Sequence, residues 1–372
     1  MTRIISFIFF ITIVSLIYFS IHLFVYKVIA VNLDSPVTSM KALKIFFWFS
    51  GLSFFIGMFL SRIFKIHWLI QYSYLWMGII SISFFVLLLV FVMGKLIQSQ
   101  TKLITIIGLC ITGIIVIMSL YNALRYPIVK ELTVPIKKLP AQWRGFSIVQ
   151  LSDLHLESYK SIKSIDYIVN KVNQLKPDLI LITGDLIDGN ICQETIFCQY
   201  LERLNAPYGI VAVTGNHEFY AGLDIFLKLA ERSHIKVLRN ENCMIADFLQ
   251  LVGLDDDEAR HYGGKGPDLE TALNGCDMSK PAILLYHRPT HFDTAVSRGV
   301  DLQLSGHTHG GQIPPIDLLV WLVYKYPVGL FKKAESFIYT TYGTGYWGPP
   351  MRFLSRNEIV KITLIDKRIK LY

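Results

Sequence analysis

Residues 146–155 read FSIVQLSDLH, a short apolar run that ends in Asp153 and His155. Later apolar runs end in a similar manner, at Gly184-Asp185, at GNHE over 215–218, at His287 and at GHTHGGQ over 306–312. In open α/β sheets, ligand sites form just beyond the carboxyl ends of the strands. We therefore expect five strand ends to bring their polar side chains to one place.

The chain around these junctions alternates strand-like and helix-like segments, which predicts a layered α/β fold. Strand-like runs cover Phe146–Leu151, Leu179–Thr183, Gly209–Thr214, Ile235–Leu238, Phe248–Leu254, Ala282–Tyr286, Leu302–Leu304, Phe337–Tyr342 and Glu358–Ile365. Helical periodicity fits Ser161–Leu175, Glu194–Leu204, Leu223–Ser233 and His291–Arg298.

The spacing of the polar residues adds to this prediction. Asp153 and His155 lie two residues apart, as do His307 and His309. Residues at this spacing on an extended backbone project to the same side, so each pair can supply two ligands to one centre. The glycines at the junctions allow tight turns where a strand stops and a ligand-bearing loop begins.

The side chains at the junctions form a mixed oxygen and nitrogen donor set without a thiolate. The set comprises two carboxylates, one amide oxygen and four imidazoles, from Asp153, His155, Asp185, Asn216, His287, His307 and His309. These are too many ligands for one tetrahedral zinc ion. The sequence therefore predicts two divalent metal ions of the Mn, Fe, Co or Zn type as cofactors.

Taken in order, the motifs resemble the pattern of the calcineurin-like metallophosphoesterase superfamily, which is D-x-H, G-D, G-N-H-[ED], a lone His and G-H-x-H. The match runs across residues 146–312. The Gly-Gly-Gln that follows and the apolar first third are similar to the membrane-associated branch of that superfamily. This branch includes proteins similar to UDP-2,3-diacylglucosamine pyrophosphatases and transmembrane proteins with a metallophosphoesterase domain. The resemblance implies a four-layered α/β/β/α sandwich with a two-metal centre between its sheets.

The resemblance also implies which residues hold each metal. Asp153, His155, Asp185 and His309 would hold the first ion, and Asp185, Asn216, His287 and His307 would hold the second. Asp185 would bridge the two, since an anionic carboxylate easily spans two cations. Two ions about 4 Å apart can polarise a phosphoryl group and ionise a bridging water near neutral pH. We expect in-line attack without a covalent enzyme intermediate.

His217 is the superfamily's candidate for catalysis, by protonating the leaving oxygen or by stabilising charge on the phosphoryl group. The alternative is a structural ring, held by Glu218 or by a carbonyl. Asp188 follows Asp185 by three residues. It could orient a metal ligand, or it could serve in a turn or cap.

The first third of the chain is apolar. The whole chain has 372 residues, of which 52% are hydrophobic and 17% charged. Stretches without a charged residue in their middle cover Ile4–Val25, Ala42–Leu60, Trp68–Met93 and Leu103–Tyr121. Each is close to the ~20 residues that a helix needs to cross a bilayer. We expect four transmembrane helices over 1–124, a linker over 125–145 and a calcineurin-like metallophosphoesterase domain over 146–372.

Charge is distributed unevenly between these parts. The net charge is +8, and +7 of it belongs to residues 1–124, where the basic residues lie between apolar runs. This pattern is typical of a protein whose partner is the lipid bilayer, and we expect no nucleic-acid partner. A nuclease is also disfavoured because residues 125–372 are nearly neutral.

The side of the membrane follows from the positive-inside rule. Lys and Arg favour the side of both chain ends by eight to five, which predicts an inner-membrane protein with its phosphoesterase domain in the cytoplasm. The five cysteines, Cys110, Cys192, Cys198, Cys243 and Cys276, show no C-x-x-C pairing. This agrees with a reducing compartment.

Three segments outside the motifs receive an interpretation. Leu318–Tyr324 is apolar but too short to span a bilayer. It could lie at the lipid surface and admit an acyl substrate, with Lys325, Lys332 and Lys333 near anionic headgroups, or it could be a buried helix on the sheet. We interpret Asp255–Glu258 as a solvated loop. Gly343–Arg352 is expected to be the loop of a closing hairpin, with Arg352 a candidate to reach a substrate phosphate.

These observations favour a membrane-anchored, metal-dependent phosphoesterase or pyrophosphatase. Its substrate is expected to be lipid-linked, such as a UDP-diacylglucosamine-type glycolipid. The alternative is a transporter or sensor whose helices are regulated by the metal-binding domain. It ranks second because no intramembrane charge marks a transport path. A protein phosphatase is disfavoured because no Arg follows Asp185 in the GDLID stretch.

Overall fold

The computed structural model describes the chain except for residues 1, 35, 65, 158–161, 189–193 and 367–372. The chain divides into two compact units. The membrane unit comprises residues 1–124 together with the short segments 312–317 and 348–354. The sandwich unit comprises residues 125–311, 318–347 and 355–372.

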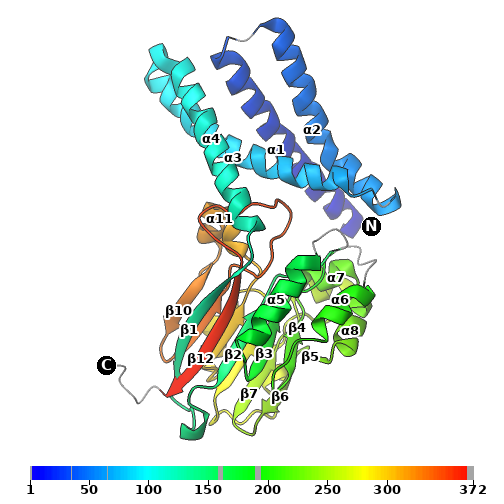
Figure 1. Ribbon diagram of the computed structural model, residues 1–372, viewed down its shortest axis with the longest axis vertical. Coiled ribbons are helices and arrows are strands. Elements are labelled where there is room, and N and C mark those ends of the chain that lie inside the picture. The colour runs from blue at the N-terminus through cyan, green and yellow to red at the C-terminus, as the bar shows by residue number, and fades with distance from the viewer. Residues whose placement is uncertain (1, 35, 65, 158–161, 189–193, 367–372) are drawn as a thin grey trace. The chain divides into compact units, whose positions relative to one another are not determined.

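Long helices form most of the membrane unit (Figure 1). Over the described residues they are α1 (Thr2–Asn32), α2 (Val37–Phe64), α3 (Trp68–Leu96) and α4 (Thr101–Leu124), with a short 3-10 turn at Gln98–Gln100. All four helices are long and apolar enough to cross a membrane, as the sequence predicted. Many of their large apolar side chains are exposed, which suits helices surrounded by lipid.

Hydrogen bonds join the helices of the membrane unit. The indole Nε1 of Trp76 donates to Nε2 of His22 at 2.8 Å. The other ring nitrogen of His22, Nδ1, lies 2.8 Å from the carbonyl oxygen of Tyr18. Because an indole N–H can only donate, Nε2 of His22 is the acceptor and Nδ1 carries the proton. The imidazole is therefore neutral, and both of its nitrogens are satisfied.

Two loop segments from the second half of the chain belong to the membrane unit. Ile313 and Met351 join Ile82 and Val86 in a buried apolar cluster. Hydrogen bonds also join the backbone of these segments to the helices. Pro314 O accepts from Ser81 Oγ at 2.9 Å, Arg352 N donates to Ser119 O at 2.8 Å, and Arg352 O accepts from Asn122 Nδ2 at 3.2 Å. Residues 348–352, at the end of the loop that we expected to close a hairpin, therefore pack against α3 and α4. The side chain of Arg352, the candidate for contact with a substrate phosphate, is fully buried.

The sandwich unit contains two mixed sheets, each six-stranded over the described residues. The first has the order β1 (Ile128–Ile136), β12 (Glu358–Asp366), β2 (Ser147–Leu151), β3 (Leu179–Thr183), β4 (Ile210–Val213) and β5 (Ile235–Val237). The second has the order β10 (Gly329–Lys333), β11 (Ser336–Thr340), β9 (Leu302–Ser305), β8 (Ala282–Leu285), β7 (Leu249–Gly253) and β6 (Glu241–Ile245). Strands β2 to β5 are parallel to one another, as are β7, β8, β9 and β11.

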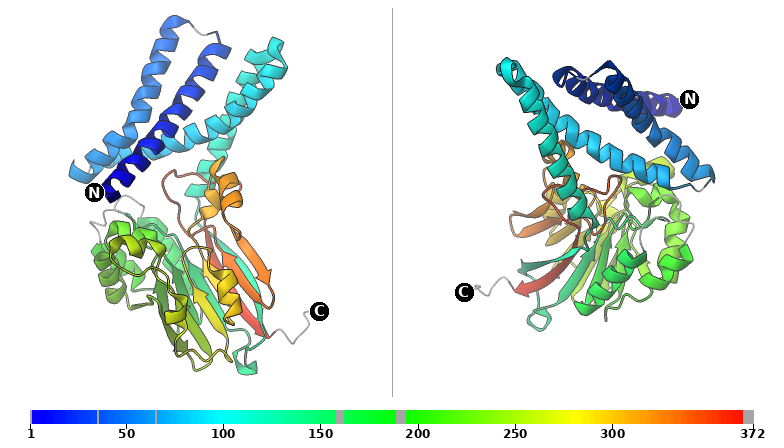
Figure 2. Two further views of the ribbon diagram at one scale, coloured as in Figure 1. Left: turned by 180° about the vertical axis from the view of Figure 1, so that it is seen from behind. Right: turned by 45° about the horizontal axis from the view of Figure 1, so that its top comes forward.

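Alternating side chains divide the unit into four layers. Ile148 and Leu181 of the first sheet share one buried cluster with Leu251 and Ile283 of the second, so the sheets pack face to face. The outer face of the first sheet packs under α5 (Ile162–Gln174), α6 (Glu194–Leu201) and α8 (Leu223–Arg232) (Figure 1, Figure 2). The outer face of the second packs under α9 (Leu269–Leu273) and α10 (Phe292–Ser297). The predicted α/β/β/α sandwich is confirmed.

The structure contains strands that the sequence analysis missed. Strand β1 lies within residues 125–145, which we expected to be a linker, and it pairs in parallel with β12 while burying Val134 and Ile136. Strands β6 and β10 are edge strands with a single neighbour. Their residues are mostly exposed or half-buried. An edge strand needs no continuous apolar run, so these segments lack the pattern that identified the others.

Candidate metal centre

The predicted site residues stand at the carboxyl ends of neighbouring strands. The structure places Asp153 and His155 after β2, Asp185 after β3, Asn216 and His217 at the start of α7 (Asn216–Ala221) after β4, His287 after β8, and His307 and His309 after β9. Two strand ends of the second sheet therefore face three of the first. All of these side chains are buried except that of His307, which is half-buried.

Asp153, His155 and His309 form one group of donors. Their ligand atoms lie within 4.8 Å of one another. The Nε2 atoms of His155 and His309 are 3.0 Å apart, and Nε2 of His309 is 3.4 Å from Oδ1 of Asp153. An oxygen and two imidazole nitrogens thus converge on one point, which is the geometry that a metal ion requires.

Asp185, His287 and His307 form a second group within the same 4.8 Å limit. Nε2 of His287 lies 3.1 Å from Oδ2 of Asp185, and Nδ1 of His307 lies 3.2 Å from that same imidazole nitrogen. The amide oxygen of Asn216 joins this group at 3.0 Å from Nδ1 of His307. These are the four residues that the resemblance assigns to a second ion.

Asp185 lies between the two groups. Its Oδ2 atom is 3.1 Å from Nε2 of His287 and 3.8 Å from Nε2 of His155. One carboxylate oxygen therefore faces imidazoles of both groups, as a bridging ligand would.

The donor set fits a pair of divalent cations. Asp153 and Asp185 are buried, and within the described residues no Lys or Arg pairs with either carboxylate. Buried carboxylates require cationic partners. Burial alone would lower the pKa of His287, but the charge of Asp185 raises it to about 10. Conversely, burial would raise the pKa of Asp185, while the nearby His287 and His217 hold it well below its usual value. The local field thus attracts positive charge to Asp185.

Glu218 fixes the backbone of the centre. Its buried carboxylate accepts hydrogen bonds from the N–H groups of Gly215 (2.6 Å), Leu186 (2.8 Å), Asp185 (2.9 Å) and Ile187 (3.2 Å). These contacts tie the loop after β3 to the start of α7. Burial, assisted by the charge of Asp185, raises the pKa of Glu218 to about 7. Glu218 does not hold the ring of His217, as the alternative structural role had it, because its oxygens are occupied by backbone groups.

Asp188 holds the ring of His217 instead. Its Oδ1 atom lies 2.8 Å from Nδ1 of His217, and its Oδ2 atom lies 3.4 Å from Nδ1 of His155. Burial alone would lower the pKa of His217, but Asp185 and Asp188 raise it to about 9. Of the two roles considered for Asp188, the structure favours orientation of imidazoles over a turn or cap.

The backbone at the site differs from the expected extended pairs. Asp153 and His155 have φ values of 53° and 47°, and His307 and His309 have values of 71° and 50°. These are left-handed conformations, which non-glycine residues adopt at a cost of about 1–3 kcal/mol each. The paired side chains converge because the chain coils after each strand, and Gly306 is required there because a Cβ would overlap Asp153.

The acidic run after β7 begins with two buried carboxylates that pair with arginines. The interpretation of Asp255–Glu258 as a solvated loop is therefore wrong for its first two residues. Asp255 and Asp256 are buried. Asp255 pairs with Arg239 at 2.7 Å and accepts from Thr214 Oγ1 at 2.6 Å. Asp256 accepts two hydrogen bonds of 2.8 Å from Arg288. Because Arg288 follows His287 directly, this bidentate pair supports the loop that carries His287.

Comparison with known proteins relates this chain to a family. The model of a protein family described as "Calcineurin-like phosphoesterase" matches residues 146–311. A "Transmembrane protein with metallophosphoesterase domain" of Danio rerio is 37% identical over 272 residues, which cover 70% of this chain and 62% of that protein. An "Uncharacterized metallophosphoesterase" of Campylobacter jejuni is 34% identical over 290 residues, or 76% of each chain.

The chain spans 62% of the length of its relatives from Danio rerio and Bos taurus. Among solved structures, a dimetal phosphatase from Danio rerio aligns with a TM-score of 0.36 and 14% identity, over 59% of this chain and 99% of that one.

Replacing Glu218 with Gln should loosen the centre. The amide retains one oxygen acceptor but turns an NH₂ group toward backbone donors, and each buried group left unsatisfied costs about 1–3 kcal/mol. We expect a lower melting temperature and a lower metal content by inductively coupled plasma mass spectrometry. Glu270→Gln, at an exposed helix position, is the control. If both variants melt and retain metal as the wild type does, Glu218 does not organise the centre.

Proposed function

Because this chain belongs to the calcineurin-like phosphoesterase family, we propose that it is a membrane-anchored enzyme that hydrolyses a phosphoester or pyrophosphate bond with two divalent metal ions. The observation that carries this proposal is the position of Asp185, whose single carboxylate faces both groups of buried donors. Bound there, two divalent cations would supply Lewis acidity and lower the pKa of a water molecule.

The protein's own residues would do the remaining work. Asp153, His155, Asp185 and His309 would hold the first cation, and Asp185, Asn216, His287 and His307 would hold the second. His217 is the candidate proton donor to the leaving oxygen. Its Nδ1 atom is engaged by Asp188 at 2.8 Å, so the opposite nitrogen, Nε2, is the one to face a substrate. The hydrogen bond with Asp188 favours the protonated ring and is one cause of the raised pKa of His217.

Replacing Asp185 with Asn should abolish activity, because a neutral amide cannot bridge two cations. We expect at least a hundredfold loss of turnover of bis(p-nitrophenyl) phosphate and a lower metal content. Chelation should inactivate the wild type, and adding back Mn, Fe, Co or Zn singly would identify the metals. The matched control is Asp166→Asn, at a half-exposed position paired with Arg203 on the helical face. Undiminished turnover in Asp185→Asn would exclude the mechanism.

We further propose that the substrate is lipid-linked, for example a diacylated sugar nucleotide. The support comes from α11 (Ile316–Val323), which follows His309 by only seven residues. None of its eight residues, all of them described, is buried. Trp321, Leu322 and Val323 are 57%, 81% and 73% exposed. The interpretation of this segment as a buried helix is therefore wrong, and an apolar helix so exposed suits a lipid surface.

Helix α11 is also tied to the candidate centre. Tyr324 follows the helix directly, and its ring lies edge-on to that of His307 with the centroids 6.0 Å apart. The basic residues beyond it are less available than expected, because Lys325 and Lys333 both pair with Asp293. We infer that α11 contributes an apolar lip, through which acyl chains of a membrane-bound substrate reach the site.

Replacing Trp321 and Leu322 together with Ser should separate lipid from soluble substrates. Both side chains are exposed, so folding should survive, while docking on the bilayer should weaken. We expect at least a tenfold lower rate on a diacylated phosphoester in vesicles and an unchanged rate on bis(p-nitrophenyl) phosphate. Equal losses on both substrates would contradict a lipid-contacting role for α11.

The chain is a membrane protein, and we propose that it resides in the inner membrane with the sandwich unit in the cytoplasm. The excess of Lys and Arg on the side of both chain ends supports this orientation. Cys198, Cys243 and Cys276 of the sandwich unit are free, as a reducing compartment allows, while Cys192 lies outside the described residues. A green fluorescent protein fused after Tyr372 should fluoresce, and an alkaline phosphatase fused there should be inactive. The reverse pattern would place the domain outside.

A further inference from the structure

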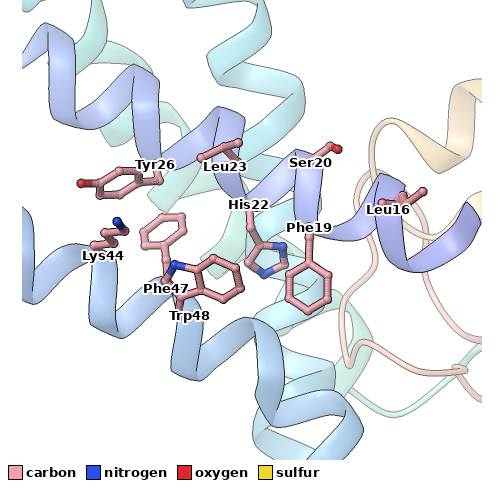
Figure 3. Close-up of a pocket in the computed structure, with 9 residues that line it drawn as sticks. All are labelled: Leu16, Phe19, Ser20, His22, Leu23, Tyr26, Lys44, Phe47 and Trp48. Carbon is pink, nitrogen blue, oxygen red and sulfur yellow. The ribbon is translucent and has the colours of Figure 1, made fainter. Parts of the chain in front are cut away.

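A pocket of about 340 Å³ lies between α1 and α2 in the membrane unit (Figure 3). Residues of both helices line it, namely Leu16, Phe19, Ser20, His22, Leu23, Tyr26, Lys44, Phe47 and Trp48. This volume falls in the range of pockets that bind small ligands. None of the family motifs falls on these residues, so the hydrolytic reaction does not account for the pocket.

The walls of the pocket are aromatic and apolar. The rings of Phe19 and Trp48 face each other across the two helices, with their centroids 5.9 Å apart. His22 belongs to the wall, because Trp76 and the Tyr18 carbonyl already engage both of its nitrogens. These surfaces suit an acyl chain and offer little to a polar solute.

Lys44 gives the pocket a charged end. It stands seven residues after Val37, where α2 begins, and Tyr26 stands six residues before Asn32, where α1 ends. Both are therefore about 10 Å along a helix from the connection at 33–36. Leu16 lies ten residues before Tyr26, so the apolar end is about 15 Å further along α1. Figure 3 shows the two ends apart, with Lys44 beside Tyr26 and Leu16 at the opposite side.

The ammonium of Lys44 lacks an internal counterion. Asp34 is the one acidic residue in residues 1–124. No ion pair joins Lys44 to a carboxylate within the part of the chain that the structure describes, and Asp34 lies exposed at the end of α1. Lys44 is exposed about 10 Å along α2 from its start, where a long cationic side chain can reach the interface and anionic lipid headgroups. Because residues 1–124 hold no acid besides Asp34, an anion that meets this ammonium comes from outside the chain.

We propose that the pocket binds an anionic phospholipid, with one acyl chain along Phe19, Phe47 and Trp48 and the phosphate at Lys44. The arrangement of the lining residues matches that of a phospholipid. Lys44 lies toward the helix ends, where the headgroup would be, and the apolar side chains lie deeper, where an acyl chain would be. The site is formed by α1 and α2 alone, so it is distinct from the metal centre. It gives the membrane unit a ligand of its own beyond a role as an anchor.

Lys41 provides a matched control for this proposal. It lies on the same helix as Lys44, one turn nearer the start of α2, and it does not line the pocket. A general attraction of lysines to anionic lipid would involve both residues equally. Binding in the pocket would depend on Lys44 alone.

Native mass spectrometry of the full-length protein, released from micelles with defined lipids, tests the site. We expect the wild type to retain one dioleoyl phosphatidylglycerol at least fivefold more than dioleoyl phosphatidylcholine. Lys44→Gln should lose this preference, whereas Lys41→Gln and Lys44→Arg should keep it. Fluorescence of Trp48, taken as the difference from Trp48→Phe, should be quenched by the brominated form of the retained lipid.

Three results would overturn the proposal. They are equal retention of the two lipids by the wild type, equal losses in Lys41→Gln and Lys44→Gln, or stronger binding of oleate than of phosphatidylglycerol. Hydrolysis of bis(p-nitrophenyl) phosphate by Lys44→Gln should match the wild type. An inactive wild type would count against the proposed reaction and leave the lipid measurement intact, so the two failures can be told apart.

Discussion

Negative charge buried at the carboxyl ends of the strands is the constraint on which the rest of this structure depends. Asp153 and Asp185 lie buried without a Lys or Arg partner in the described chain, and imidazoles and backbone donors surround them. Buried carboxylates need positive charge beside them, which His287 and His217 supply in part to Asp185 and which bound cations would complete. The Glu218 contacts, the left-handed backbone and the close approach at Gly306 all serve to hold these carboxylates in place.

Sequence patterns predicted most of this site, because its polar residues interrupt apolar strands at their carboxyl ends. The gathering of the seven donors followed from that rule, whereas the four layers followed from the resemblance to the calcineurin-like superfamily. What escaped prediction depends on tertiary contacts. In the sequence, Asp255 and Asp256 are typical of a solvated acidic run. Their burial depends on ion pairs with Arg239 and Arg288, which the sequence pattern does not reveal. Strand β1 lacks a long apolar run, since its partner β12 supplies the pairing that makes it a strand.

Asp188 connects two imidazoles with different expected tasks. One oxygen holds Nδ1 of His217 and the other approaches Nδ1 of His155, so one carboxylate sets the orientation of a candidate proton donor and of a candidate ligand. Movement of either ring would disturb the other through this shared contact. The candidate proton donor and the candidate first cation site are thereby coupled through one carboxylate.

The membrane unit is not confined to the beginning of the chain. Segments 312–317 and 348–354 pack with α3 and α4, and Ile313 and Met351 fill the same apolar cluster as Ile82 and Val86. Three separate segments of the chain therefore contribute to this unit. Cleavage after Leu124 and removal of the helices would expose the apolar side chains of Ile313 and Met351. Packing of the membrane unit is therefore complete only after residues 348–354 have been synthesised.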